Sequence, residues 1–142
     1  ACDRVFNDVD ICVMSAAVAD YRPKHVASSK VKKTEGEWAI EMERTTDILK
    51  ALGERKRANQ LLVGFALETD NELENAKGKL ERKNLDFIVL NSLNNEGAGF
   101  AFDTNKITLI ERSGNITNFE LKSKAEVAAD IVDKLIALCG RN

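Results

Sequence analysis

The sequence is poor in the residues that build metal centres and disulfide frameworks. It has one histidine, His25, and three cysteines, Cys2, Cys12 and Cys139, which share no short spacing. A histidine-based metal site and a Ser-His-Asp triad are therefore disfavoured, and so are a zinc cluster and a disulfide scaffold. Cys12 lies in an apolar run, so we expect a buried thiol. The cysteine usage indicates a reducing, cytoplasmic compartment.

Long apolar runs and a strong charge of one sign are also missing. No apolar segment approaches the roughly 20 residues of a membrane span, so we expect no membrane partner. The formal net charge is −2, which disfavours binding to nucleic acid, so any anion site must be local. Hydrophobic residues make up 44% and charged residues 31% of 142 positions, as in one soluble globular domain spanning 1–142.

The patterning that is present alternates strands with helices. Continuous apolar runs predict buried strands, and period-2 alternation in "WAIEMER" predicts a half-buried one. We expect strands over 9–16, 38–44, 60–68 and 85–92, a hairpin over 106–122 with a turn at "SGN", helices over 45–57, 70–84 and 123–140, and a long loop over 17–35. This order predicts a doubly wound, Rossmann-like α/β fold. Its mainly parallel sheet has strand 9–16 near the centre and an antiparallel hairpin extension.

Helix ends carry recognisable caps. Thr45 or Thr46 is the expected N-cap of the first helix, with Asp47 in its first turn, and Asp70 or Asn71 caps the second. Ser123 and Glu126 match a capping box. The opening "ACDRVFND" resembles the end of a helix and has no initiator Met, so we expect a fragment of a longer protein.

Ligands of open α/β sheets bind beyond the carboxyl ends of the strands. Here those ends are the small-residue run Ser15–Asp20, the segment Phe65–Thr69, and Asn91 with Ser92. Small residues let a flat ligand approach the backbone, and Asp20 can then bind a base or a ribose. Asp20 as a local cap of a tight turn explains the spacing equally well.

Three groups of residues are candidates for binding phosphate. The stretch "SSKVKK" carries Lys30, Lys32 and Lys33; Lys79 and Lys83 share a helix face; and the helix beginning near Thr46 presents free N–H groups. Solvated surface charge explains both lysine groups without a ligand, and any helix start has such N–H groups. No Walker A loop and no GxGxxG occurs, and "GAGF" is too short to be a dinucleotide loop.

Several segments, taken in order, resemble a known family. "SAAVADYRP", "KVKK", "TTDIL", "VGFALET", "KNLDFIVLN" and "GFAFDTNKITLI" together resemble the bacterial phosphopantothenate–cysteine ligases, and the resemblance covers nearly the whole chain. It implies ligation of 4'-phosphopantothenate to L-cysteine in coenzyme A biosynthesis. CTP is the co-substrate, an acyl-cytidylate the intermediate, and Mg²⁺ or Mn²⁺ the assisting ion. It also implies a homodimer, a possible fused decarboxylase, and a preceding Gly-rich portion that this sequence lacks.

The resemblance also assigns roles to individual residues. Lys30 matches the lysine needed for the acyl-cytidylate step, and Lys32 and Lys33 belong to the same flap, expected to close over the CTP phosphates. Thr46 stands where the family usually has proline. The implied nucleotide contacts are Met14, Ser15, Ala16, Asp20, Lys30, Thr46, Asp47, Ile48, Leu49, Phe65, Lys79 and Lys83.

Two other functions remain as alternatives. A nucleotide-binding α/β module without catalysis would keep the CTP contacts and lack those of the acid substrate. A Rossmann-like oxidoreductase is disfavoured by the missing GxGxxG.

Overall fold

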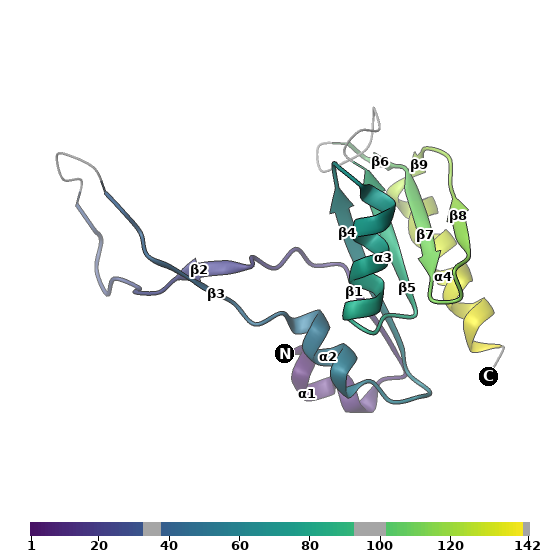
Figure 1. Ribbon diagram of the computed structural model, residues 1–142, viewed down its shortest axis with the longest axis horizontal. Helices are drawn as coiled ribbons and strands as arrows, with labels where there is room; N and C mark the ends of the chain where they lie inside the picture. Colours follow the sequence, from purple (N-terminus) through teal and green to yellow (C-terminus); the bar gives the residue numbers. More distant parts are fainter. Residues whose placement is uncertain (33–37, 93–101, 141–142) are drawn as a thin grey trace.

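The central feature of the fold is a five-stranded mixed sheet. The computed structural model describes residues 1–32, 38–92 and 102–140. The strand order is β1 (Ile11–Met14), β4 (Leu61–Glu68), β5 (Phe87–Ser92), β7 (Ile107–Glu111) and β8 (Ile116–Asn118) (Figure 1). The first three strands run parallel, and the β7–β8 hairpin continues the sheet antiparallel. This confirms the expected mainly parallel sheet with a hairpin extension.

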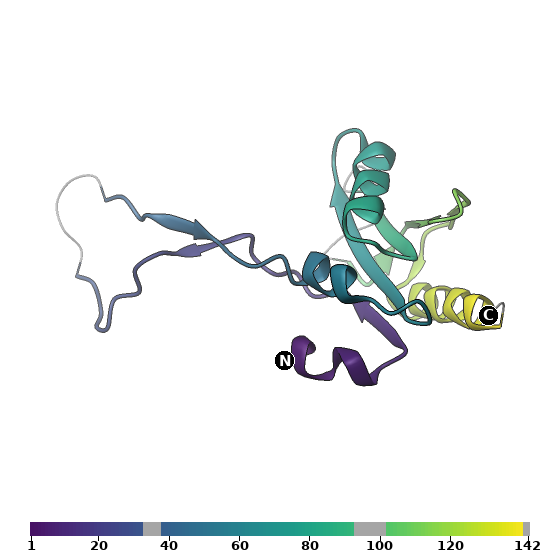
Figure 2. The ribbon, with the colours of Figure 1, turned by 60° about the horizontal axis from the view of Figure 1, so that its bottom comes forward.

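Helices cover both faces of this sheet. On one face, α1 (Cys2–Val5), the 3₁₀ turn η1 (Phe6–Asp8), α2 (Ile48–Arg55) and α3 (Glu72–Arg82) pack around Leu62, Ile88 and Leu90. On the other, α4 (Lys124–Cys139) packs against Val63, Phe87 and Val89. Figure 2 shows α3 and α4 on opposite sides of the sheet. Successive residues of β5 enter opposite cores, as strand geometry requires.

Strand β1 lies at the edge of the sheet, so the expected central position is wrong. Among the described residues it pairs with β4 alone, and Ile11 and Val13 are each 40% exposed. An apolar run indicates burial but does not fix which strands flank it. Cys12 is half-buried, not fully buried as expected. Its partial burial is the main cause that raises the pKa of its thiol, and the nearby Cys2 raises that pKa further.

A long two-stranded arm, residues 15–32 and 38–46, leaves the body of the molecule. Within it β2 (Tyr21–Pro23) pairs antiparallel with β3 (Met42–Arg44), so the expected loop over 17–35 contains a strand (Figure 1). The expected half-buried strand over 38–44 is shorter and exposed: its apolar side chains, Trp38, Ile40 and Met42, are 67%, 51% and 48% exposed. Apolar and polar side chains do alternate over 38–44, but no other described part of the chain covers the apolar face of this segment.

The helix caps agree in part with expectation. Asp47, not Thr45 or Thr46, is the N-cap of α2, because its carboxylate accepts the Lys50 backbone N–H at 3.0 Å. Asn71 is the N-cap residue of α3 but makes no side-chain cap. The capping box of Ser123 and Glu126 at α4 is confirmed. So is the hairpin turn, where Gly114 adopts a φ of 90° that favours glycine.

Two short strands, β6 (Thr104–Asn105) and β9 (Lys122–Ser123), form a small antiparallel pair beside the main sheet. The pair joins the start of the hairpin to the start of α4. None of the helices in the described parts of the chain is long and apolar enough to cross a bilayer.

Candidate functional site

A cleft of about 1010 Å³ lies at the carboxyl ends of the parallel strands. Its walls come from the segment after β1, the start of α2, the end of β4, one face of α3, the end of β5 and the apolar side of α4. This is the edge where open α/β sheets bind ligands. A smaller hollow of about 320 Å³, between β5 and the hairpin, does not contain the predicted site residues.

The cleft gathers nearly all of the residues predicted to contact nucleotide. They reach it from four separate stretches of the sequence, which β1, α2, β4 and α3 bring around one cavity. The predicted residues that line it are Met14, Ser15, Ala16, Asp20, Thr46, Asp47, Ile48, Leu49, Phe65, Lys79 and Lys83. Their role in binding remains a prediction, but their assembly around one cavity is an observation.

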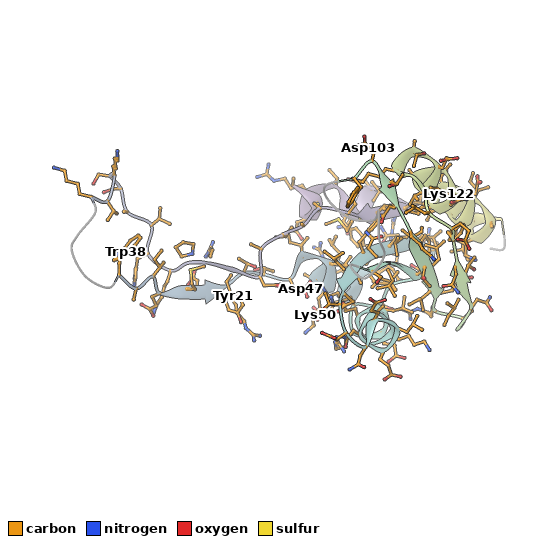
Figure 3. The ribbon with its side chains drawn as sticks, turned by 90° about the horizontal axis from the view of Figure 1, so that it is seen from above. Tyr21, Trp38, Asp47, Lys50, Asp103 and Lys122 are labelled. Carbon is orange, nitrogen blue, oxygen red and sulfur yellow. The ribbon has the colours of Figure 1, made fainter. Side chains whose placement is uncertain are left out.

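The arm carries the remaining predicted residues away from this cleft. Lys30 and Lys32 are exposed on the arm and do not line the cleft. Figure 3 shows Trp38 of the arm well away from Asp47 at the body, with Tyr21 between them. Lys33 and the "GAGF" segment lie outside the described residues. The structure therefore leaves the predicted flap closure as a prediction.

Two lysines of the cleft, Lys79 and Lys83, are held by carboxylates from other elements. Lys79 Nζ lies 2.6 Å from Glu68 Oε1 at the end of β4, and Lys83 Nζ lies 3.0 Å from Asp47 Oδ2 at the start of α2. The lysines are four residues apart on α3, so they share one face. The wall of the cleft thus presents two ammonium groups fixed in position, and an anion would compete with Glu68 and Asp47 for them.

Asp47 is the most strongly connected carboxylate of the site. Its partial burial by itself would raise the pKa, but the hydrogen bond from Lys50 and the hydrogen bond and charge of Lys83 outweigh that effect. The pKa of Asp47 therefore lies below its ordinary value, and the side chain is ionised at neutral pH. It joins the N-terminus of α2 to the C-terminal end of α3.

The base of the arm is fixed beside the small-residue run. The Thr45 backbone N–H donates to Asp20 O at 2.9 Å, and Thr45 Oγ1 donates to Ala19 O at 2.6 Å. Within 1–32, 38–92 and 102–140 the Asp20 carboxylate has no hydrogen-bond or ion-pair partner. Its side chain therefore caps nothing there, which favours the ligand-binding interpretation over the local cap.

Sequence reasoning missed part of the cleft. Asn105 and Lys124 line it, as do the apolar side chains of α4, including Val127 and Ile131. The missed signal was that the hairpin and the last helix start at the same sheet edge where β5 ends. Lys124 is the first residue of α4, directly after the N-cap Ser123, and its backbone N–H donates to Asp103 O at 2.9 Å.

The donor set bears on the expected divalent ion. No group of three or more His, Cys, Asp or Glu side chains suited to a metal occurs among the described residues. The cleft offers the carboxylate of Asp20 and, if Lys83 releases it, that of Asp47. One or two carboxylates with phosphate oxygens are the usual protein share of a Mg²⁺ site. These residues fit an ion that arrives with a nucleotide.

Comparison with known proteins places the chain in a family. A family model described as the DNA/pantothenate metabolism flavoprotein C-terminal domain matches residues 1–138. The chain belongs to this family. Membership in the DNA/pantothenate metabolism flavoprotein family confirms the resemblance inferred from "SAAVADYRP", "VGFALET" and the other segments.

Members of the family differ in their names. A protein named cysteine/cysteine sulfinic acid decarboxylase, from an unknown prokaryotic organism, is 55% identical over 133 residues, covering 94% of this chain and 37% of that protein. The coenzyme A biosynthesis bifunctional protein CoaBC of Bacillus subtilis strain 168 is 44% identical over 134 residues, covering 94% and 33%. This chain thus spans about a third of the length of these curated relatives.

A solved structure gives the same fold. The crystal structure of the C-terminal domain of a coenzyme A biosynthesis bifunctional protein CoaBC aligns with a TM-score of 0.79 at 37% identity, covering 99% of this chain and 60% of that chain. The described residues therefore share the fold of that CoaBC C-terminal domain.

Proposed function

We propose that this chain takes part in coenzyme A biosynthesis by ligating 4'-phosphopantothenate to L-cysteine with CTP. One observation supports this most strongly: every predicted nucleotide contact except Lys30 lines one and the same cleft at the strand ends. The CoaBC relatives are named for coenzyme A biosynthesis, which agrees with the proposal. Because the chain spans about a third of them, the activity of the whole relative is part of the proposal.

Different walls of the cleft bind different parts of CTP. Lys79 and Lys83 bind phosphate oxygens, and their ion pairs with Glu68 and Asp47 are replaced by contacts to the ligand. The small side chains of Ser15 and Ala16 admit the nucleotide close to the backbone. Phe65, half-buried at the end of β4, lies beside the base. Fixed positive groups that face a triphosphate also stabilise charge that develops there.

The proposed reaction has two steps. The phosphopantothenate carboxylate attacks the α-phosphate of CTP, forming an acyl-cytidylate and releasing pyrophosphate. The amine of cysteine then attacks the acyl carbon and displaces CMP. The attacking carboxylate is already ionised, so the first step needs no base. A bound Mg²⁺ or Mn²⁺ would supply further charge neutralisation at the phosphates.

Lys30 serves the first step by bringing an ammonium group to the α-phosphate. In the structure its position on the arm, outside the cleft, means that the arm must change position relative to the cleft. The alternating apolar row of the arm also supports the expected homodimer, since Trp38, Ile40 and Met42 are exposed together.

The test is to trap the acyl-cytidylate. The protein is incubated with phosphopantothenate, CTP and Mg²⁺ but no cysteine, and the adduct is sought by mass spectrometry together with pyrophosphate release. We expect both products from a chain of the full length of the CoaBC relatives. CTP binding with neither product from that longer chain would leave the non-catalytic nucleotide-binding module as the function.

A further inference from the structure

Two asparagines that line the cleft form a hydrogen-bonded amide pair. Asn105 Nδ2, at the end of β6, donates to Asn91 Oδ1, near the end of β5, at 2.9 Å. Asn105 Oδ1 accepts the backbone N–H of Lys106 at 3.0 Å. Both side chains are half-buried, and both line the cleft.

The direction of this pair is fixed by chemistry. A backbone N–H can only donate, so the Asn105 atom facing Lys106 must be the oxygen. The other end of that amide is then its N–H₂ group, a donor, and the Asn91 atom it meets must be an acceptor. Asn91 is therefore held with its oxygen toward Asn105, and its own N–H₂ group takes no part in this hydrogen bond.

That N–H₂ group is free to serve a ligand. Asn91 has no other hydrogen-bond partner in the part of the chain that the structure describes, and its two N–H groups are donors only. Asn91 pairs in register with Leu67 of β4, two residues after Phe65. The donor thus lies in the cleft next to the apolar patch of Phe65 and Leu67, which also line it.

We propose that Asn105 is a positioning residue that locks the Asn91 amide so that Asn91 donates to an acceptor atom of the bound nucleotide's base. The inference rests on the proposed function, which puts the base beside Phe65. Asn105 acts through Asn91: it decides whether the cleft meets a donor or an acceptor at this point. Without the lock, either end of the Asn91 amide can face the ligand.

The substitution Asn105→Asp reverses the lock at almost constant shape. One aspartate oxygen still accepts the Lys106 N–H, but the other is an acceptor, so the Asn91 amide turns its N–H₂ toward residue 105 and its oxygen toward the cleft. We expect the Kd of CTP, measured by calorimetry on the 142-residue chain, to rise about tenfold, equivalent to about 1.4 kcal/mol. The matched control is Asn118→Asp: Asn118 is exposed on β8, outside the cleft, and its Oδ1 accepts from Thr108 at 2.8 Å. It should bind CTP as the parent does.

A negative charge placed near a triphosphate also weakens binding. The effect of Asn105→Asp on the orientation of the Asn91 amide must therefore be distinguished from the effect of its charge. In the Asn91→Ala background there is no amide to orient, while the charge of Asn105→Asp remains. The proposal therefore expects Asn105→Asp to cost about tenfold with Asn91 present and less than twofold in Asn91→Ala. Equal costs in both backgrounds would assign the effect to charge and overturn the lock.

Side-chain NMR tests the same idea without substitutions, in case a variant does not fold. On titration with CTP, the N–H₂ resonances of Asn91 should shift strongly and those of Asn105 little. A strong shift of Asn105 alone, or of neither, with CTP bound, overturns the inference and leaves the proposed function standing. Failure of the unsubstituted chain to bind CTP under conditions where the longer chain does not bind it either would overturn both.

Discussion

Lys83 and Asp47 join two helices at the wall of the cleft, with Lys83 Nζ 3.0 Å from Asp47 Oδ2. The same carboxylate caps α2 by accepting the Lys50 backbone N–H. One side chain therefore orders the start of α2 and holds a lysine that we assign to phosphate binding. The contact couples stability to ligand affinity, and each part can be measured separately.

Replacing Asp47 tests the stabilising part. We expect Asp47→Ala to lower the free energy of unfolding by about 1 kcal/mol at pH 7, the usual cost of losing an N-cap. The pKa of Asp47 is lower in the fold than in the unfolded chain, so its charge stabilises above the unfolded value of about 3.9. That stabilisation is lost as the pH falls through the lower folded value. Urea unfolding should therefore show a smaller difference at pH 3, with Asp133→Ala, an exposed position on α4, as control.

Removing the lysines tests the binding part. Lys79→Gln and Lys83→Gln should each weaken CTP affinity about tenfold, since each removes a charge-assisted contact to phosphate. Lys77→Gln is the matched control, because Lys77 is exposed on the same helix and does not line the cleft. Calorimetry at two salt concentrations should show a weaker salt dependence in the two cleft variants. If Lys77→Gln weakened binding equally, general charge and not the cleft would be responsible.

Lys30 is expected to act on the reaction more than on binding. In a chain of the full length of the CoaBC relatives, Lys30→Gln should slow acyl-cytidylate formation greatly while the fold remains intact. Pyrophosphate release without cysteine measures this step, and circular dichroism checks the fold. A parental rate would remove Lys30 from the mechanism.

Gly53 marks the closest approach of α2 to the end of α3. A Cβ at Gly53 would overlap the carbonyl oxygen of Lys83, which is backbone and cannot move aside, whereas a Cβ at Gly78 meets only the flexible end of Arg82. We expect Gly53→Ala to destabilise the fold by about 1–3 kcal/mol. Gly78→Ala, inside α3, should be neutral or stabilise by up to about 1 kcal/mol. Thermal unfolding of both variants makes the comparison, and an equal effect would contradict the close packing.

The arm tests the proposed homodimer. Trp38 is the only tryptophan of the sequence and is 67% exposed. Association through the arm would bury it, so its fluorescence maximum should move to shorter wavelength as concentration rises, in step with sedimentation. Ile40→Ser should weaken this association, whereas Ile136→Ser, on an exposed part of α4 outside the arm, should not. Dimers that form with unchanged Trp38 emission would place the interface elsewhere.

Local pattern was a good guide wherever the cause of structure is local. The parallel strands, the three long helices, the hairpin turn at Gly114 and the capping box of Ser123 follow from apolar periodicity, turn chemistry and caps within a few residues. The N-cap of α2 was misplaced by one or two residues because Thr45, Thr46 and Asp47 all suit a cap. In the structure Asp47 accepts the Lys50 backbone N–H, and the same carboxylate also contacts Lys83, which is distant in sequence.

The sequence by itself determined the class of fold, the family, and most of the side chains that line the cleft, since strand ends and motif order are written along the chain. The tertiary structure decided what depends on distant partners. It set β1 at an edge, exposed the apolar row of Trp38 and Ile40, and paired Lys79 and Lys83 with carboxylates. It also brought Asn105 into contact with Asn91, 14 residues away. The backbone N–H of Lys106 determines that Asn105 is the donor of this hydrogen bond. Burial and hydrogen bonding between separate segments are properties of the packed chain, and periodicity along the chain cannot specify them.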